Sequence, residues 1–261
     1  MSVEQKLCNG MGYEHCVLFS AARVAIAHYV RWQFAGAPVF IPSNVCPALA
    51  NAIGDPVLLP VSATSGLSEP GARVIVQLYG CRKGKDCELE IDPLMSGWRL
   101  SSIGRSIIIS FGYSKTINIG YGGAFLTNNL YIAQDMKRYS DWCRDDKTEQ
   151  LDYELDRLDE VIKRRKERMA LWDLYLPEWC IKPDIEPVMP WRVIRRISGS
   201  YNRDYLADGL RRVGFNVGTN YPPLPGCTDP SSMKWGKEVV NFWLDDDPVK
   251  ARGVLDRMTG L

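Results

Sequence analysis

Lys115 is the residue of this 261-residue chain that is best placed to do chemistry. It lies between a β-branched apolar segment, Ile107–Phe111, and a turn that contains Gly120, Gly122 and Gly123. The apolar segment predicts a strand buried on both faces, and the glycines let the following backbone turn tightly close to a ligand. An amine held there can form a Schiff base with an aldehyde if burial or nearby positive charge disfavours its ammonium form. The simpler alternative is a solvated lysine at a strand end.

Two polar residues upstream of Lys115 favour the chemical interpretation. Asp92 ends an apolar segment, where a carboxylate is a poor core residue. A carboxylate can hold a pyridine nitrogen protonated, and with a Schiff-base lysine this is the usual protein contribution to pyridoxal phosphate chemistry. Ser110 ends the predicted strand and could donate a hydrogen bond to a cofactor phosphate, although a lone serine is more often a strand residue bonded to backbone.

Six blocks of sequence, in the same order, resemble the DegT/DnrJ/EryC1/StrS sugar aminotransferases, which are fold-type I pyridoxal-phosphate enzymes. The most specific block, Ser110–Gly123, is similar to the family's Ser-Phe-x-x-x-Lys-x-x-x-x-Gly-x-Gly-Gly. The other blocks are Leu18–Ile26, Val39–Ala48, Ile75–Gly80, Ile91–Asp92 and Gly214–Leu224. The resemblance covers most of the chain and implies an α/β fold, with a mostly parallel sheet in a large domain and a small α+β C-terminal domain.

The resemblance also implies a role for each matching residue. Lys115 would carry the cofactor as a Schiff base and move the proton during transamination, Asp92 would face the pyridine nitrogen, and Ser110 would bind the phosphate. The backbone amides of Ala22 and Arg23 would complete the phosphate cradle. A helix N-terminus suits this last role on physical grounds, because its N–H groups are unsatisfied and its dipole favours an anion.

The same segments have plainer interpretations. The segment Ala21–Trp32 could be an ordinary amphipathic helix capped by Ser20, which is compatible with the phosphate role. Cys46 falls where the family often places the residue stacked over the cofactor ring, but a buried turn cysteine fits equally well. Asn220 and Tyr221 could lie near the substrate, or their Pro-Pro loop could only turn the chain.

Several residues differ from the family pattern. Met95 stands where the family usually has a glutamine or histidine that hydrogen-bonds the cofactor hydroxyl, and a thioether is a poor substitute. Gln77 replaces a common histidine, and Ala22 replaces a glycine, which requires a negative φ at that position. The family's Gly-x-Asn-x-Arg-Met stretch, whose asparagine reaches the phosphate in a partner subunit, has no visible counterpart in the segment Ser140–Leu151.

The chain divides into a predicted large domain, residues 1–176, and a small domain, residues 177–261. The large domain ends in one long amphipathic helix, Leu151–Leu176. The connections 62–73 and 81–90 are too short for helical crossovers, so we expect a sheet thinly covered on one face and a homodimer that covers it. After a Pro-rich link, Pro183–Pro190, the predicted small-domain elements are strand Trp191–Ile197, helix Tyr201–Val213, strand Phe215–Val217, strand Val239–Leu244 and helix Pro248–Met258.

Composition argues against several classes of protein. The net charge is +1, from 32 basic and 31 acidic residues, which gives no bulk reason to expect nucleic-acid or membrane binding. The N-terminus lacks a leader pattern, and the eight cysteines form no C-x-x-C pair, so we expect a cytoplasmic protein with reduced thiols. Two histidines, His15 and His28, make a zinc site or a Ser-His-Asp hydrolase improbable.

Three functions remain open at this point. The first is a pyridoxal-phosphate aminotransferase of amino-sugar biosynthesis, which would move an amino group from glutamate or glutamine onto a keto or aldehyde carbonyl, with a nucleotide-linked keto sugar as the family's habitual acceptor. The second keeps the cofactor but changes the reaction, for example to dehydration. The third is a non-enzymatic descendant that binds or assembles with a partner. Retention of Lys115, Asp92 and Ser110 favours catalysis, whereas Met95 and the missing partner loop favour the third.

Overall fold

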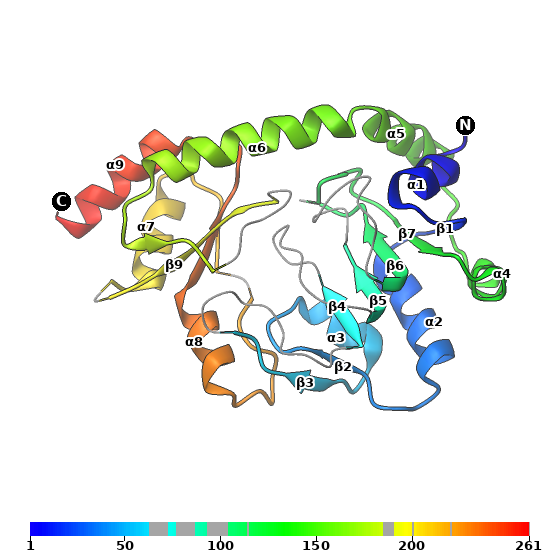
Figure 1. Cartoon of the computed structure of the whole chain (residues 1–261). Coiled ribbons are helices and arrows are strands. Elements are labelled where there is room, and N and C mark those ends of the chain that lie inside the picture. Colours follow the sequence, from blue (N-terminus) through cyan, green and yellow to red (C-terminus); the bar gives the residue numbers. More distant parts are fainter. Residues whose placement is uncertain are drawn as a thin grey trace.

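We analysed a computed structural model of the chain (Figure 1), which describes residues 1–62, 73–76, 87–92, 104–113, 115–184, 191–199, 201–219 and 221–260. The helices are α1 Val3–Met11, α2 Ala22–Phe34, α3 Pro47–Ile53, α4 Leu130–Arg138, α5 Asp145–Asp156, α6 Leu158–Tyr175, α7 Arg203–Arg212, α8 Pro230–Glu238 and α9 Pro248–Thr259. The strands are β1 His15–Phe19, β2 Phe40–Pro42, β3 Val57–Leu59, β4 Val74–Val76, β5 Cys87–Ile91, β6 Gly104–Ser110, β7 Gly123–Thr127, β8 Cys180–Ile181, β9 Val193–Ile197, β10 Val217–Gly218 and β11 Val239–Phe242.

The central sheet has the strand order β1-β7-β6-β5-β4. Strand β7 is antiparallel to both of its neighbours, while β6, β5 and β4 pair in parallel, so β7 alone runs against the direction of the other four. A parallel pair, β2 and β3, continues beside β4, where the Arg73 amide donates to the Phe40 carbonyl at 3.2 Å. Because parallel strands end at one edge of a sheet, residues that follow β5 and β6 are brought together there.

The two faces of this sheet have separate cores. On β6, Ile108 packs with α2 and α3 in one apolar cluster, while Ile107 and Ile109 pack with α1 and α5 in the other. This alternation follows from the two-residue period of a strand. All three isoleucines are buried, as predicted for a strand covered on both sides.

The C-terminal part has its own antiparallel sheet, in the order β10-β11-β9-β8. Helices α7 and α9 pack with it, and α6 runs along the top of the molecule to reach it (Figure 1). Trp172 of α6 is fully buried there, stacked on Phe242 with ring centroids 5.0 Å apart, and its indole N–H donates to the Leu244 carbonyl at 3.2 Å. The predicted small-domain strands and helices are present with shifted ends; the short strand β8 and helix α8 were missed.

Three predictions about local structure were wrong. Ser20 does not cap α2, because its hydroxyl and amide are engaged with Asp141, and Ala21 is the N-cap residue. The long helix is two helices, α5 and α6, separated at Arg157. The segment 81–90 is not wholly a connection, since β5 begins at Cys87. The remainder of both predicted connections lies largely outside the described residues, as do Gln77, Met95 and Asn220.

None of the helices in the described part of the chain combines the length and apolar character needed to cross a bilayer.

Candidate functional site

A cavity of about 580 Å³ lies at the edge of the central sheet where β5 and β6 end. Its lining includes all six residues predicted from the sequence, namely Ala22, Arg23, Cys46, Asp92, Ser110 and Lys115. They come from α2, the loop before α3, the last residue of β6 and the segments that follow β5 and β6. The C-terminal part of the chain contributes Trp191 and Tyr221 to the same cavity.

Lys115 and Asp92 form an ion pair within this cavity. The Lys115 Nζ lies 2.6 Å from the Asp92 Oδ2, and the two side chains are 23% and 8% exposed. The other carboxylate oxygen of Asp92 accepts from the Ser110 amide at 2.8 Å, while the Asp92 amide donates to the Ile108 carbonyl at 2.7 Å. The carboxylate is therefore held by the backbone of β6 as well as by the lysine.

The pair determines the charge of the lysine in the free protein. Burial lowers the pKa of Lys115, but the charge and hydrogen bond of Asp92 outweigh it, so the pKa is raised above its usual value. Burial also raises the pKa of Tyr221, against the opposing effect of the Lys115 charge. At neutral pH Lys115 is thus an ammonium group and Tyr221 is a neutral phenol.

The N-terminus of α2 borders the same cavity. No side chain in the described part of the chain makes a capping hydrogen bond to it, and both Ala22 and Arg23 line the cavity. The turn after Lys115 packs against it closely, since a Cβ on Gly123 would lie 2.7 Å from the Ala22 nitrogen. Ala22 is a helical residue with no positive φ, which meets the condition for alanine at this position.

The segment 140–144 contacts the two turns that border the cavity. The Ser140 hydroxyl donates to the Leu18 carbonyl at 2.7 Å, and the Asp141 carboxylate accepts from the Ser20 amide at 2.8 Å and from its hydroxyl. Trp142 packs so closely on Gly122 that a Cβ there would lie 2.3 Å from the indole ring. These residues fix the two turns that border the cavity.

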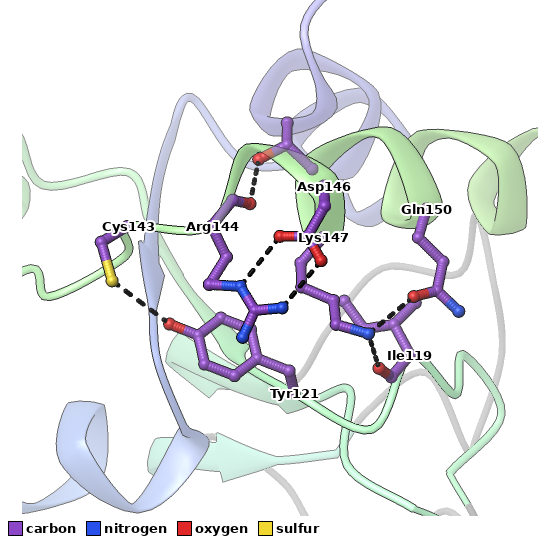
Figure 2. A network of polar contacts seen from close by, with 8 residues as sticks. Ile119, Tyr121, Cys143, Arg144, Asp146, Lys147 and Gln150 are labelled. Carbon is purple, nitrogen blue, oxygen red and sulfur yellow. Dashed lines mark hydrogen bonds and ion pairs between the residues drawn. The ribbon is translucent and has the colours of Figure 1, made fainter.

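Figure 2 shows how Tyr121, which lines the cavity, is held from the same segment. The Arg144 guanidinium lies 5.7 Å from the centre of the Tyr121 ring and is held by Asp146 at 2.8 Å. The Tyr121 hydroxyl is 4.0 Å from the Cys143 sulfur. Lys147 donates to the Ile119 carbonyl at 3.0 Å, which attaches α5 to the turn before Tyr121.

Neither protein-family models nor the curated proteins give a match to this sequence. Solved structures do. A DegT/DnrJ/EryC1/StrS aminotransferase from Brucella abortus is 19% identical, with a TM-score of 0.79 over 99% of this chain and 90% of that one. The fold of the present chain is therefore that of these aminotransferases.

Two further structures agree. PseC of Helicobacter pylori, an aminotransferase of pseudoaminic acid biosynthesis, is 15% identical, with a TM-score of 0.84 over 99% of this chain and 91% of its own. DesI, solved with its TDP-sugar product, is 19% identical, with a TM-score of 0.81 over 98% of this chain and 82% of its own. The α/β fold predicted from the sequence is confirmed, and the chain spans most of the length of these structures.

Trp191 is a cavity residue that sequence reasoning missed. It is buried, lines the cavity, and has its indole ring centre 5.2 Å from the Lys115 Nζ. From the sequence it was assigned only to the start of a predicted strand, Trp191–Ile197. Tyr221, for which a place near the substrate and a simple turn were both left open, lines the cavity.

Proposed function

We propose that this chain is a pyridoxal-phosphate-dependent aminotransferase. It would transfer an amino group from glutamate or glutamine to the keto or aldehyde carbonyl of a small molecule, most simply a nucleotide-linked keto sugar. The observation that carries the proposal is the Lys115–Asp92 ion pair, with 2.6 Å between the Lys115 Nζ and the Asp92 Oδ2. It lies in the cavity that the N-terminus of α2 borders. The sugar acceptor is supported by structures of the same fold, one of which was solved with a TDP-sugar product.

The residues of the cavity fit this cofactor. A phosphate would find N–H donors at the start of α2 and the Ser110 hydroxyl, which now accepts weakly from the Gly112 amide at 3.3 Å. The Lys115 amine would meet the aldehyde, the Asp92 carboxylate would meet the pyridine nitrogen, and Cys46 would lie against the ring. The phosphate, the aldehyde and the pyridine nitrogen of the cofactor thus each have a chemically suitable partner in one cavity.

Bound in this cavity, the cofactor would supply an electron sink for a carbanion at the substrate carbon. Asp92 would keep a positive charge on the ring nitrogen, and the backbone of Ser110 holds this carboxylate in place at 2.8 Å. The Lys115 Nζ would take the proton from the α carbon of the amino donor and later give one to the carbon of the acceptor. Tyr221 stays neutral and can donate a hydrogen bond to a substrate oxygen.

The proposal is tested by covalent capture on Lys115. Purified protein is incubated with pyridoxal phosphate, its visible absorption is recorded, and borohydride is added before mass spectrometry of peptides. We expect a yellow protein that borohydride bleaches, with the added mass on Lys115. The Lys115→Ala variant should show neither colour nor added mass, whereas Lys137→Ala, on the exposed face of α4, should behave as wild type. A wild-type protein that takes up no cofactor would refute the proposal.

Amino transfer is tested separately from cofactor binding. The loaded protein is mixed with glutamate or glutamine, and the corresponding keto acid is measured in a single turnover. Release of one keto acid per site supports the aminotransferase. A protein that binds the cofactor but releases no keto acid from either donor carries out another reaction of the same cofactor.

We also propose the division into residues 1–176 and 177–261 and a homodimeric assembly. Limited proteolysis near residue 176 and light scattering of the purified chain test them. A monomer at micromolar concentration would argue against the dimer.

A further inference from the structure

Trp191 is fixed in the cavity wall by contacts on its backbone and side chain. The residue is 7% exposed, and its carbonyl accepts from the Arg165 Nη1 of α6 at 3.0 Å. The neighbouring Arg192 guanidinium lies 4.8 Å from the same indole and 4.6 Å from the Trp243 ring, and donates to the Asn241 side chain at 3.0 Å. The indole therefore has little freedom to move away from Lys115.

The Lys115 ammonium lies 5.2 Å from the centre of the Trp191 ring, within the range of a cation–π interaction. Tryptophan gives the strongest interaction of this kind, and exclusion of water strengthens it. The interaction exists only while the lysine is charged. It therefore favours the ammonium over the free amine, in the same direction as the Asp92 carboxylate 2.6 Å away.

We propose that Trp191 is a positioning residue that holds Lys115 charged beside Asp92 and so sets how readily its amine reacts with a carbonyl compound. The proposal deepens the proposed function and rests on it. Besides Asp92, the titratable groups that influence Lys115 are Tyr221 and Cys46, both of which line the cavity. The raised pKa of Lys115 agrees with this arrangement, in which burial alone would lower it.

A purely structural role for Trp191 predicts an effect of opposite sign. If the indole only walled off the cavity, a smaller residue would admit water, relieve the burial of Lys115 and stabilise its ammonium further. If the indole binds the ammonium, loss of the indole lowers the pKa of Lys115 and increases the fraction of free amine. The direction of the change in Lys115 reactivity thus separates the two roles.

The experiment measures reductive methylation of Lys115 by formaldehyde and cyanoborohydride over a pH series, with mass spectrometry of the Lys115 peptide. The protein is first dialysed against hydroxylamine to remove any bound aldehyde. In Trp191→Leu we expect the midpoint of the pH profile to fall by about 0.5–1 unit, equivalent to about three- to tenfold faster labelling at a fixed pH below it. Trp191→Phe keeps a weaker aromatic face, so its midpoint should lie between those of wild type and Trp191→Leu.

Lys137 provides the internal reference, because its labelling should be the same in all variants. If Trp191→Leu does not fold, as judged by circular dichroism, Trp191→Phe and Trp191→Met carry the comparison. A folded variant with an unchanged or higher midpoint overturns the proposal. Uptake of pyridoxal phosphate is scored independently: a lowered midpoint without uptake refutes the proposed function only, and uptake with an unchanged midpoint refutes only the role of Trp191.

Discussion

The ion pair between Lys115 and Asp92 should contribute measurably to the stability of the free protein. At 2.6 Å and an effective dielectric constant of about 20, the attraction is about 6 kcal/mol, and removing both charges from water cancels most of it. We therefore expect a coupling free energy of about 2 kcal/mol. Lys115→Met should cost about 3 kcal/mol, because it leaves the Asp92 carboxylate buried with the Ser110 amide as its other hydrogen-bond donor.

The assay is a double-mutant cycle of wild type, Lys115→Met, Asp92→Asn and the double variant, measured by urea unfolding without cofactor. Asparagine suits this test because it keeps the shape of Asp92 and tolerates its positive φ of 56°. A loss of stability in the double variant that equals the sum of the losses in the two single variants to within about 0.5 kcal/mol would show that the two side chains are not coupled. That result would refute the ion pair.

The pH dependence of the same cycle gives a second check. The pKa of Lys115 is raised in the folded protein, so its contribution to stability is fully present below the ordinary lysine pKa of 10.5 and is lost as pH rises through the folded value. Above neutral pH, the stability difference between wild type and Lys115→Met should therefore persist until strongly alkaline pH. A difference that already disappears at pH 8 would contradict the assigned charge state.

Three further variants test other parts of the site. Gly122→Ala should lower the free energy of unfolding by about 2–3 kcal/mol, because φ is 87° at this position and the new Cβ meets the ring of Trp142. An unchanged urea unfolding curve would contradict this packing. Burial raises the pKa of Asp141, but its hydrogen bonds from Ser20 lower it more. Asp141→Asn should therefore lower the free energy of unfolding by about 0.5–1 kcal/mol at pH 7, a figure that allows for solvent exposure. The stability difference between wild type and Asp141→Asn should shrink as pH falls below 3.8. Ser110→Ala should weaken pyridoxal phosphate binding about tenfold while leaving binding of pyridoxal unchanged in a fluorescence titration, and equal weakening of both would exclude a phosphate contact.

Lys115, Asp92 and Ser110 were predictable because their positions follow from local sequence. Ala22, Arg23 and Cys46 were placed in the site by the resemblance to the aminotransferase family. Asp92 and Ser110 each end an apolar strand, and parallel strands β5 and β6 place such residues at one edge. The helix that begins at Ala22 was visible from its apolar period. Once the strands pair in register, these separate signals meet in one cavity.

The parts that were missed depend on contacts between distant segments. Ser20 is a good capping residue by type, but Asp141, far along the chain, engages both its amide and its hydroxyl. The break at Arg157 was hidden because Leu155 and Leu158 on either side pack in the same core, so the apolar pattern continues across it. Propensity and period contain no information about such long-range partners.

Asp92 combines two features that ordinarily lower stability. It is a non-glycine residue with a φ of 56°, and it carries a charge while being 6% exposed. A left-handed conformation and a buried charge each cost free energy, and a glycine or an asparagine would avoid one or both costs. Here the unfavourable conformation points the carboxylate to both the Ser110 amide and the Lys115 amine. Strain and a buried charge that converge on one side chain in a cavity are typical of a site selected for function over stability, and this is a physical argument in support of the proposed function.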